Sequence, residues 1–142
     1  SPLIVHWPAG LKRRGELEPQ PGHVIDLLPT CLELAGADYP QEHNGKDTIP
    51  VAGKSLLRAI VSQERQPRQL FWEHQGNRAV RDGDWKLVAP HNRPWELYNL
   101  AKDRTELVNL ADQQPQRVKE MTALWKEWAN EAGVQPWPVK RK

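Results

Sequence analysis

Cysteine, phenylalanine and methionine are scarce in this sequence, since each occurs once in 142 residues. One cysteine excludes an internal disulfide and a cysteine-rich zinc site. Apolar runs of the roughly 20 residues that cross a bilayer are also missing, and no charged-then-apolar leader opens the chain, so we expect neither a membrane span nor a signal peptide in it. Charge of one sign is not in excess: 20 Lys+Arg against 18 Asp+Glu give +2, which does not favour nucleic acid as a partner.

Proline and tryptophan are abundant by contrast, with 13 Pro and 7 Trp. Hydrophobic residues make up only 38 % of the chain, below the usual roughly 45–50 %, so any core must be lean. A buried Trp covers roughly 150–250 Å². Because six of the 7 Trp lie from Trp72 onward, we expect the core in the second half of the chain.

The first half has the pattern of a short strand followed by helices. Residues 3–7 form an apolar run closed by Pro8-Ala9-Gly10, which predicts a buried strand and a turn. Asp26 is a candidate N-cap for a helix that is apolar nearly all round and ends at Gly36. A helix of this kind is normally buried between layers, and its lone Cys31 is expected to be buried with it. A second, short helix follows, with apolar positions Leu56, Leu57, Ile60 and Val61.

Residues 39–52 and 63–69 are polar and contain proline, so we interpret both as irregular links. A shift in composition near Pro67 indicates a boundary. We therefore expect two parts, residues 1–69 and residues 70–142. The chain also begins inside a predicted strand and without an initiator Met, which suggests the C-terminal part of a larger protein.

The second half predicts an antiparallel sheet and one long helix. The candidate strands are 70–72, 78–81, 85–88 and 95–98. Asp82-Gly83 between two of them indicates a tight hairpin. Pro115 stands at the preferred first position of a helix, which Gly133 ends. Its apolar stripe, expected to cover one face of the sheet, is Val118, Met121, Leu124, Trp125, Trp128, Ala129 and Ala132.

Motifs for chemistry are weak. Gly53-Lys54-Ser55 resembles the end of a phosphate-binding loop, but Thr48 stands where that loop needs glycine, and no strand precedes it. The five histidines form no closely spaced pair that could anchor a zinc site. His91 lies in a polar loop and is expected in solvent. Residues 73–78 differ, because they place five hydrogen-bonding side chains around Gly76 between two strands, a common way to build a ligand wall or simply a polar turn.

The order and spacing of several segments resemble the C-terminal third of bacterial arylsulfatase-type sulfatases, members of the alkaline phosphatase superfamily. The resemblance covers roughly residues 1–135, and its segments are 2–10, 23–30, 32–36, 53–57, 78–88 and 95–100. It implies an α/β (α+β) architecture: a remnant of the large sulfatase sheet, with one strand and helices, and then a small subdomain with a four-stranded antiparallel sheet and one long helix.

The resemblance also implies where catalysis resides. In that family a formylglycine made from Cys or Ser hydrolyses the sulfate ester, and a calcium ion held by carboxylates and an Asn polarises it. Neither motif is present: Cys31 lies outside a Cys-x-Pro-x-Arg setting, and no catalytic or metal-binding residue can be assigned to this chain. Calcium and formylglycine are therefore expected in the parent enzyme, and the chain alone is expected to be inactive.

By the same resemblance, residues 73–78 face the mouth of the active site. His74, Gln75 and Asn77 are then candidates for contacting the organic part of the substrate, and Arg78 for pairing with an anionic group or for a structural ion pair. The expected partners are the missing N-terminal region and, through apolar surface of residues 1–69, further copies of the chain. A sulfated-glycan binding module and a fragment of a phosphodiesterase or phosphonate hydrolase stay as alternatives. The parent is often exported in this family, but the sequence does not locate it.

Overall fold

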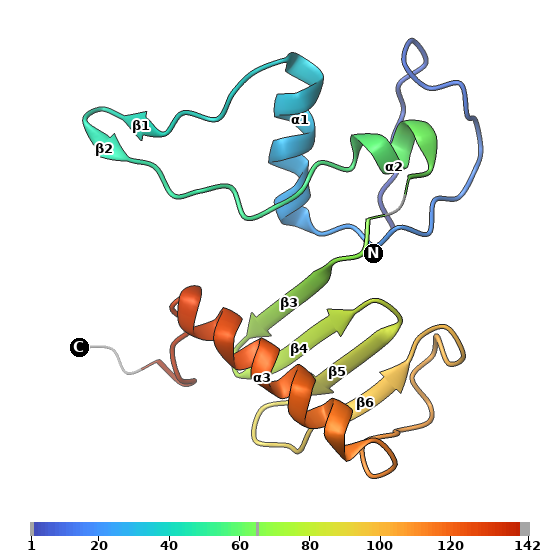
Figure 1. Cartoon of the computed structure of the whole chain (residues 1–142), viewed down its shortest axis with the longest axis vertical. Coiled ribbons are helices and arrows are strands. Elements are labelled where there is room, and N and C mark those ends of the chain that lie inside the picture. Colours follow the sequence, from blue (N-terminus) through green and yellow to red (C-terminus); the bar gives the residue numbers. More distant parts are fainter. Residues whose placement is uncertain (1, 65, 140–142) are drawn as a thin grey trace. The chain divides into compact units, whose positions relative to one another are not determined.

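Two separate units make up the chain, Ser1–Gln66 and Pro67–Lys142, called here the N-terminal and the C-terminal unit (Figure 1). The computed structural model describes residues 2–64 and 66–139. Among these residues, no helix has both the length and the apolar character that crossing a membrane requires.

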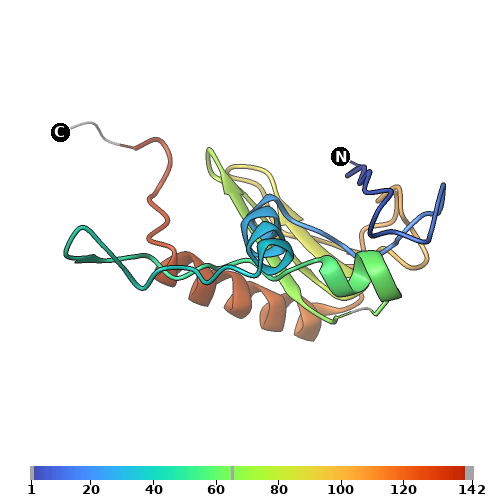
Figure 2. The same ribbon diagram turned by 90° about the horizontal axis from the view of Figure 1, so that it is seen from above.

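The C-terminal unit contains the four-stranded antiparallel sheet and the long helix that the sequence predicts. Its strands β3 (Gln69–His74), β4 (Asn77–Asp82), β5 (Trp85–Ala89) and β6 (Glu96–Asn99) pair in chain order. The helix α3 (Pro115–Glu131) then runs across one face of this sheet (Figures 1 and 2).

The ends of α3 are set by local sequence, as predicted. Pro115 occupies the first turn, where its missing N–H removes no helical hydrogen bond. Gly133 adopts a left-handed φ of 66° just after the helix, and the Val134 amide donates to the Ala129 carbonyl at 2.9 Å. The chain is thereby turned away from the helix axis at Gly133.

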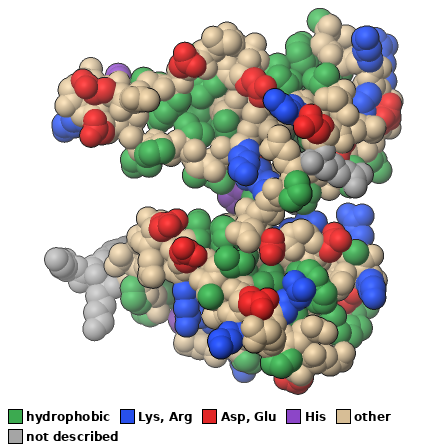
Figure 3. Space-filling view, in the orientation of Figure 1, with side chains coloured by type: hydrophobic (Ala, Val, Ile, Leu, Met, Phe, Trp, Pro, Cys, Tyr) green, Lys and Arg blue, Asp and Glu red, His purple; other side chains and the backbone are tan. Residues whose placement is uncertain are grey.

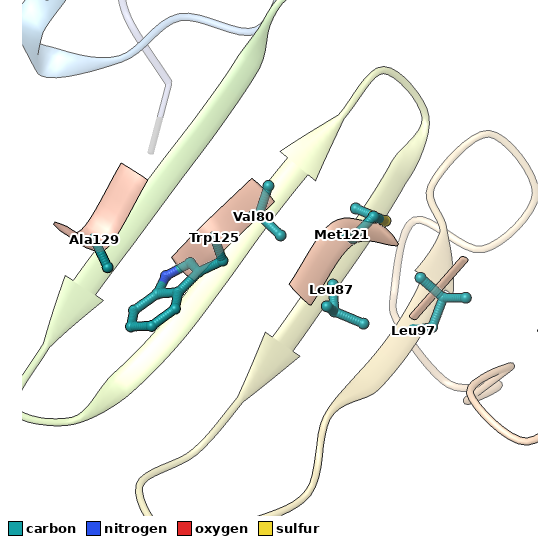
Figure 4. Close-up of a cluster of buried hydrophobic side chains, with 6 residues drawn as sticks. All are labelled: Val80, Leu87, Leu97, Met121, Trp125 and Ala129. Atoms are coloured by element: carbon teal, nitrogen blue, oxygen red, sulfur yellow. The ribbon is translucent and has the colours of Figure 1, made fainter. Parts of the chain in front are cut away.

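The core lies between α3 and the sheet. Register places Val80 opposite both Phe71 and Leu87, so these side chains share one face. The helix residues that pack on this face come from the predicted stripe, and Figure 4 shows them over the strands. The buried cluster is Val80, Leu87, Leu97, Met121, Trp125 and Ala129.

Two tight hairpins connect the first three strands. The loop between β4 and β5 consists of Gly83 and Asp84, because Asp82 still pairs with Trp85. The predicted turn at Asp82-Gly83 is therefore displaced by one residue. Gly83 takes the first loop position with a φ of 58°, which an L side chain adopts only with strain.

The N-terminal unit is held together by polar contacts around one carboxylate. The helix α1 (Leu27–Ala35) follows a short 3-10 turn, Val24–Asp26, and α2 (Leu57–Ser62) lies further along the chain. Asp26 is completely buried and accepts hydrogen bonds from the backbone N–H of His23 (2.7 Å) and of Lys54 (3.0 Å). Its side chain thus joins the start of α1 to the segment before α2, and does not cap α1 as the sequence suggested.

Close packing of the backbone requires the glycine of the Gly53-Lys54-Ser55 motif. A Cβ at this position would lie 2.0 Å from the carbonyl oxygen of Ile25, so only glycine allows the approach. Two residues after Lys54, the backbone N–H of Leu56 donates to the Thr30 hydroxyl at 2.9 Å. The motif therefore allows a close backbone approach at Gly53, while the backbone N–H groups of Lys54 and Leu56 donate to the side chains of Asp26 and Thr30.

Two predictions for the N-terminal unit are wrong. Residues 3–7 form no strand; the Gly10 and Leu11 amides close a turn on the carbonyl of Trp7. A strand needs a neighbour for its backbone groups, and no strand of the described chain lies beside this segment. Cys31 is exposed, as are apolar side chains of α1, because no residue among 2–64 and 66 covers that face. Figure 3 shows such apolar side chains open on the surface.

A small hairpin occurs where an irregular link was expected. Its strands are β1 (Glu42–His43) and β2 (Lys46–Asp47), with Glu42 opposite Asp47. Asn44 and Gly45 form the loop with φ values of 51° and 74°. Asn-Gly favours this turn strongly, so the sequence did contain the signal.

Candidate ligand-binding site at the hairpin of strands β3 and β4

The β3–β4 hairpin is shaped by backbone that turns through the left-handed region twice. Gln75 and Gly76 have φ values of 52° and 81°. The carboxylate of Glu73 accepts from the Gly76 N–H at 2.7 Å, and the side-chain Nδ2 of Asn77 donates to the His74 carbonyl at 2.8 Å. Local hydrogen bonds therefore fix the turn that carries the candidate residues.

The loop between β5 and β6 docks on this hairpin. A Cβ at Gly76 would lie 2.2 Å from Nδ1 of His91, and the His91 backbone N–H donates to the Asn77 side chain at 3.1 Å. His91 is half-buried there, although the sequence placed it in solvent. Because Asn77 uses its amide nitrogen and its oxygen in these two bonds, the structure gives it a positioning role.

The four candidate residues do not converge on one spot. Register pairs Glu73 with Arg78 and Phe71 with Val80, so Arg78 lies on the face that α3 covers. His74 pairs with Asn77 and therefore belongs to the opposite face. Gln75 is exposed in the turn itself. Because successive residues of a strand point to opposite faces, the neighbours Asn77 and Arg78 lie on different faces of the sheet.

Arg78 is held by aromatic rings. Its guanidinium carbon lies 4.5 Å from the centroid of Trp95 and 5.7 Å from that of Trp125. Such contacts contribute roughly 0.5–2 kcal/mol each, depending on desolvation. Nε of Arg78 is buried and has no hydrogen-bond partner among the residues described. The structural ion pair that the sequence left open is therefore not what holds Arg78 in residues 2–64 and 66–139.

A cavity of about 420 Å³ opens beside Arg78, between the sheet, the second half of α3 and the chain that follows it. Its lining combines basic, amide and aromatic groups, and it includes neither His74 nor Gln75. The lining residues are Glu73, Gly76, Arg78, His91, Asn92, Trp125, Lys126, Ala129, Asn130, Val134, Gln135, Pro136 and Trp137. Sequence reasoning missed most of them, because 73–78, 91–92 and 125–137 are separate segments.

On the face of the sheet opposite α3, polar and charged side chains bind one another. The Tyr98 hydroxyl donates to the Glu96 carboxylate at 2.8 Å, and this bond, with burial, raises the pKa of Tyr98 to about 12. Lys86 binds both carboxylate oxygens of Glu106 at 2.6 and 2.7 Å. The Lys86–Glu106 contact ties β5 to the loop that leads to α3, whereas the Tyr98–Glu96 bond lies within β6.

Metal ligands are not gathered in the part of the chain that the structure describes, where no group of three or more His, Cys, Asp or Glu side chains could hold an ion.

The chain is similar to a family of sulfatase C-terminal domains and to several sulfatases. Residues 1–132 match the model of a family described as N-sulphoglucosamine sulphohydrolase, C-terminal. An uncharacterized sulfatase of Schizosaccharomyces pombe is 34% identical over 119 residues, which are 78% of this chain and 22% of that protein. Arylsulfatase K of Danio rerio is 33% identical over 132 residues, 87% of this chain and 24% of that protein. The chain thus spans about a quarter of the length of these relatives.

Solved structures agree in fold. The crystal structure of Ps i-CgsB is 25% identical and superposes with a TM-score of 0.69, covering 87% of this chain and 27% of that one. The same protein has been solved in complex with k-i-k-neocarrahexaose, with the same TM-score and coverage.

Proposed function

This chain belongs to the sulfatases, as a member of the C-terminal domain family described for N-sulphoglucosamine sulphohydrolase, and we propose that it works as the non-catalytic C-terminal part of a sulfuric ester hydrolase. Two observations support this proposal: the family match over residues 1–132, and the fact that the chain spans only about a quarter of the length of its relatives. The nucleophile and the calcium site are assigned in this proposal to an N-terminal region outside the chain.

The proposed contribution of this chain is structure and part of the rim of the substrate pocket. His74 and Gln75 support the rim, since both are exposed at the hairpin and their side chains make no hydrogen bond within the described residues. A neutral imidazole and a carboxamide can each donate and accept, which suits hydroxyl groups. Asn77 would orient this rim, and Arg78 would act from the other face.

A sulfated saccharide is the proposed substrate class. Ps i-CgsB has been crystallised with a neocarrahexaose, and the matching family takes its description from a sulphohydrolase of a glucosamine. Hydroxyl-rich ligands also fit the uncharged donors and acceptors of His74 and Gln75. An aryl sulfate, which lacks these hydroxyls, serves as the contrasting substrate.

The test compares the purified chain with the longer protein that carries it. We expect the chain alone to give no turnover of an aryl sulfate and the longer protein to hydrolyse a sulfated oligosaccharide. There, His74→Ala or Gln75→Ala should raise KM for the oligosaccharide about tenfold, the equivalent of one hydrogen bond of about 1.4 kcal/mol, and change KM for the aryl sulfate little.

Gln116→Ala, at an exposed position of α3, is the matched control and should leave both KM values unchanged. Turnover by the chain alone would contradict the proposal. Affinity of the longer protein for the oligosaccharide without any turnover would favour a binding module instead. Hydrolysis of a phosphonate ester in preference to a sulfate ester would favour a phosphonate hydrolase.

Self-association of the isolated chain is a further part of this proposal. Apolar side chains are exposed over much of the N-terminal unit, among them Leu3, Leu28 and Leu34. Apolar surface on this scale favours association. We expect sedimentation to show a dimer or a larger assembly, which Leu28→Glu would dissociate; a monomer at all concentrations would contradict this part.

A further inference from the structure

The cavity beside Arg78 has a charge that suits an anion. Arg78 and Lys126 contribute permanent positive charges to its lining, and His91 adds a half-buried imidazole. Glu73 is the acidic residue in the lining, and its carboxylate already accepts the Gly76 N–H at 2.7 Å. The basic groups are therefore in excess at the open space.

Arg78 is prepared for an anion by its fixed position. The indole rings of Trp95 and Trp125 lie 4.5 and 5.7 Å from its guanidinium carbon, so the guanidinium plane is restrained before any ligand arrives. Nε of Arg78 has no hydrogen-bond partner among the described residues. A planar fork of N–H groups held in this way fits the paired oxygens of a carboxylate or a sulfate.

The rest of the lining suits a sugar ring. Trp137 is 43 % exposed and offers a flat apolar surface at the cavity. The side-chain amides of Asn92, Asn130 and Gln135 can donate to and accept from hydroxyl groups. The volume of about 420 Å³ falls within the roughly 300–1,000 Å³ of small-molecule sites.

We propose that this cavity, called here the Arg78 cleft, binds an anionic saccharide unit, a sugar ring that carries a sulfate or carboxylate group. Arg78 and Lys126 bind the anionic group, and Trp137 packs against the ring. The proposal rests on the sulfated-saccharide class proposed above, and it adds a second binding site, because Arg78 and His74 lie on opposite faces of the sheet. The cleft holds a saccharide unit without reacting with it.

The experiment is a calorimetric titration of the full chain with a sulfated carrageenan-type hexasaccharide, the same hexasaccharide after desulfation, and inorganic sulfate. We expect the sulfated form to bind at least about tenfold more tightly than either of the other two. Lys126→Ala and Trp137→Ala, both at exposed positions, should each weaken binding about three- to tenfold. Lys119→Ala, an exposed lysine of α3 outside the cleft, is the control and should leave affinity unchanged.

Arg78→Lys keeps the charge but loses the planar fork, and we expect it to weaken binding more than about tenfold. Because Arg78 packs against the indole rings of Trp95 and Trp125, near-ultraviolet circular dichroism must show that this variant keeps its fold. The two exposed variants decide the matter if it does not.

Three outcomes would overturn the cleft: no binding of the sulfated hexasaccharide, equal binding of inorganic sulfate, or binding that Lys126→Ala and Trp137→Ala leave unchanged. His74→Ala distinguishes the two proposals, since it should not affect this titration. Failure of the sulfatase proposal would instead appear as absent turnover in the longer protein.

Discussion

The two units of this chain differ in the side chains that they bury completely. In the C-terminal unit the largest fully buried side chains are apolar, and Leu87 and Met121 are among them. In the N-terminal unit the corresponding fully buried side chain is Asp26, while leucines of α1 are exposed. The N-terminal unit therefore buries a carboxylate where the C-terminal unit buries apolar side chains, and it leaves leucine side chains exposed.

The location of tryptophan follows the same division. Trp125 and Trp128 come from α3, and Trp128 stacks on Phe71 with ring centroids 5.4 Å apart. Large aromatic rings let a small unit with few apolar residues close a core. The N-terminal unit has Trp7 alone, and 38 % of that residue's surface is exposed.

The largest expected effect removes the apolar core. Leu87→Ala should lower the free energy of unfolding of the C-terminal unit by about 3 kcal/mol, because it leaves a cavity under α3. Leu34→Ala, at a leucine that is 47 % exposed, should cost about 0.5 kcal/mol or less. Urea unfolding followed by tryptophan fluorescence measures both. Equal losses would show that the two units do not differ in this respect.

Asp26→Ala tests the polar centre of the N-terminal unit. We expect a loss of about 2 kcal/mol, because the amides of His23 and Lys54 lose a charged acceptor and stay partly buried. Hydrogen exchange should quicken at these amides and stay unchanged in β4 and β5. Asp38→Ala, at an exposed carboxylate, is the control. Exchange that quickens equally in both units would refute the assigned role of Asp26.

Two glycines with positive φ, Gly36 after α1 and Gly76 in the β3–β4 hairpin, differ in how closely other residues pack against them. Gly36 in the N-terminal unit has a φ of 60°, and beyond its chain neighbours no described residue has an atom within 4 Å of an added Cβ, so Gly36→Ala should cost about 1 kcal/mol of backbone strain. Gly76→Ala adds a clash with the His91 ring and should cost about 1 kcal/mol more. Thermal unfolding measures the difference. Equal costs would mean that the β5–β6 loop yields freely.

The smallest expected effect depends on pH. The bond to Glu96 raises the pKa of Tyr98 from 10.0 to about 12, so the folded state holds this proton more tightly than the unfolded state. The stabilisation is therefore complete below pH 10 and is lost as the pH rises towards 12. Denaturant unfolding at pH 9 and pH 11 should show a decrease of about 1 kcal/mol. Tyr98→Phe should abolish that decrease; a decrease that persists would assign it to other groups.

Local signals predicted much of the fold. Candidate strands 78–81 and 85–88 lie within β4 and β5, and Pro115 and Gly133 mark the ends of α3 as expected. These features depend on neighbours along the chain: alternation, a turn glycine and the missing N–H of proline. Residues 3–7 failed as a strand because a strand depends on a partner that pattern alone does not supply.

The candidate site was predicted only in part, because its residues come from separate segments of the chain. Residues 73–78 are a hairpin, as the sequence indicated, but the pairing of Glu73 with Arg78 assigns Arg78 to the face under α3. The aromatic and amide groups beside it come from residues far along the chain, such as His91 and Trp137. No spacing within the sequence brings these segments together.

By itself, the sequence predicted the sulfatase family, an antiparallel sheet of four strands and the limits of α3, because these follow from short-range chemistry and from the order of its segments. Tertiary structure decided the rest: that His74 and Arg78 lie on opposite faces and that Arg78 meets Trp95 and Trp125 beside a cavity. The physical reason is that a side chain's face is set by strand register, and its neighbours by how the helix packs to bury apolar surface.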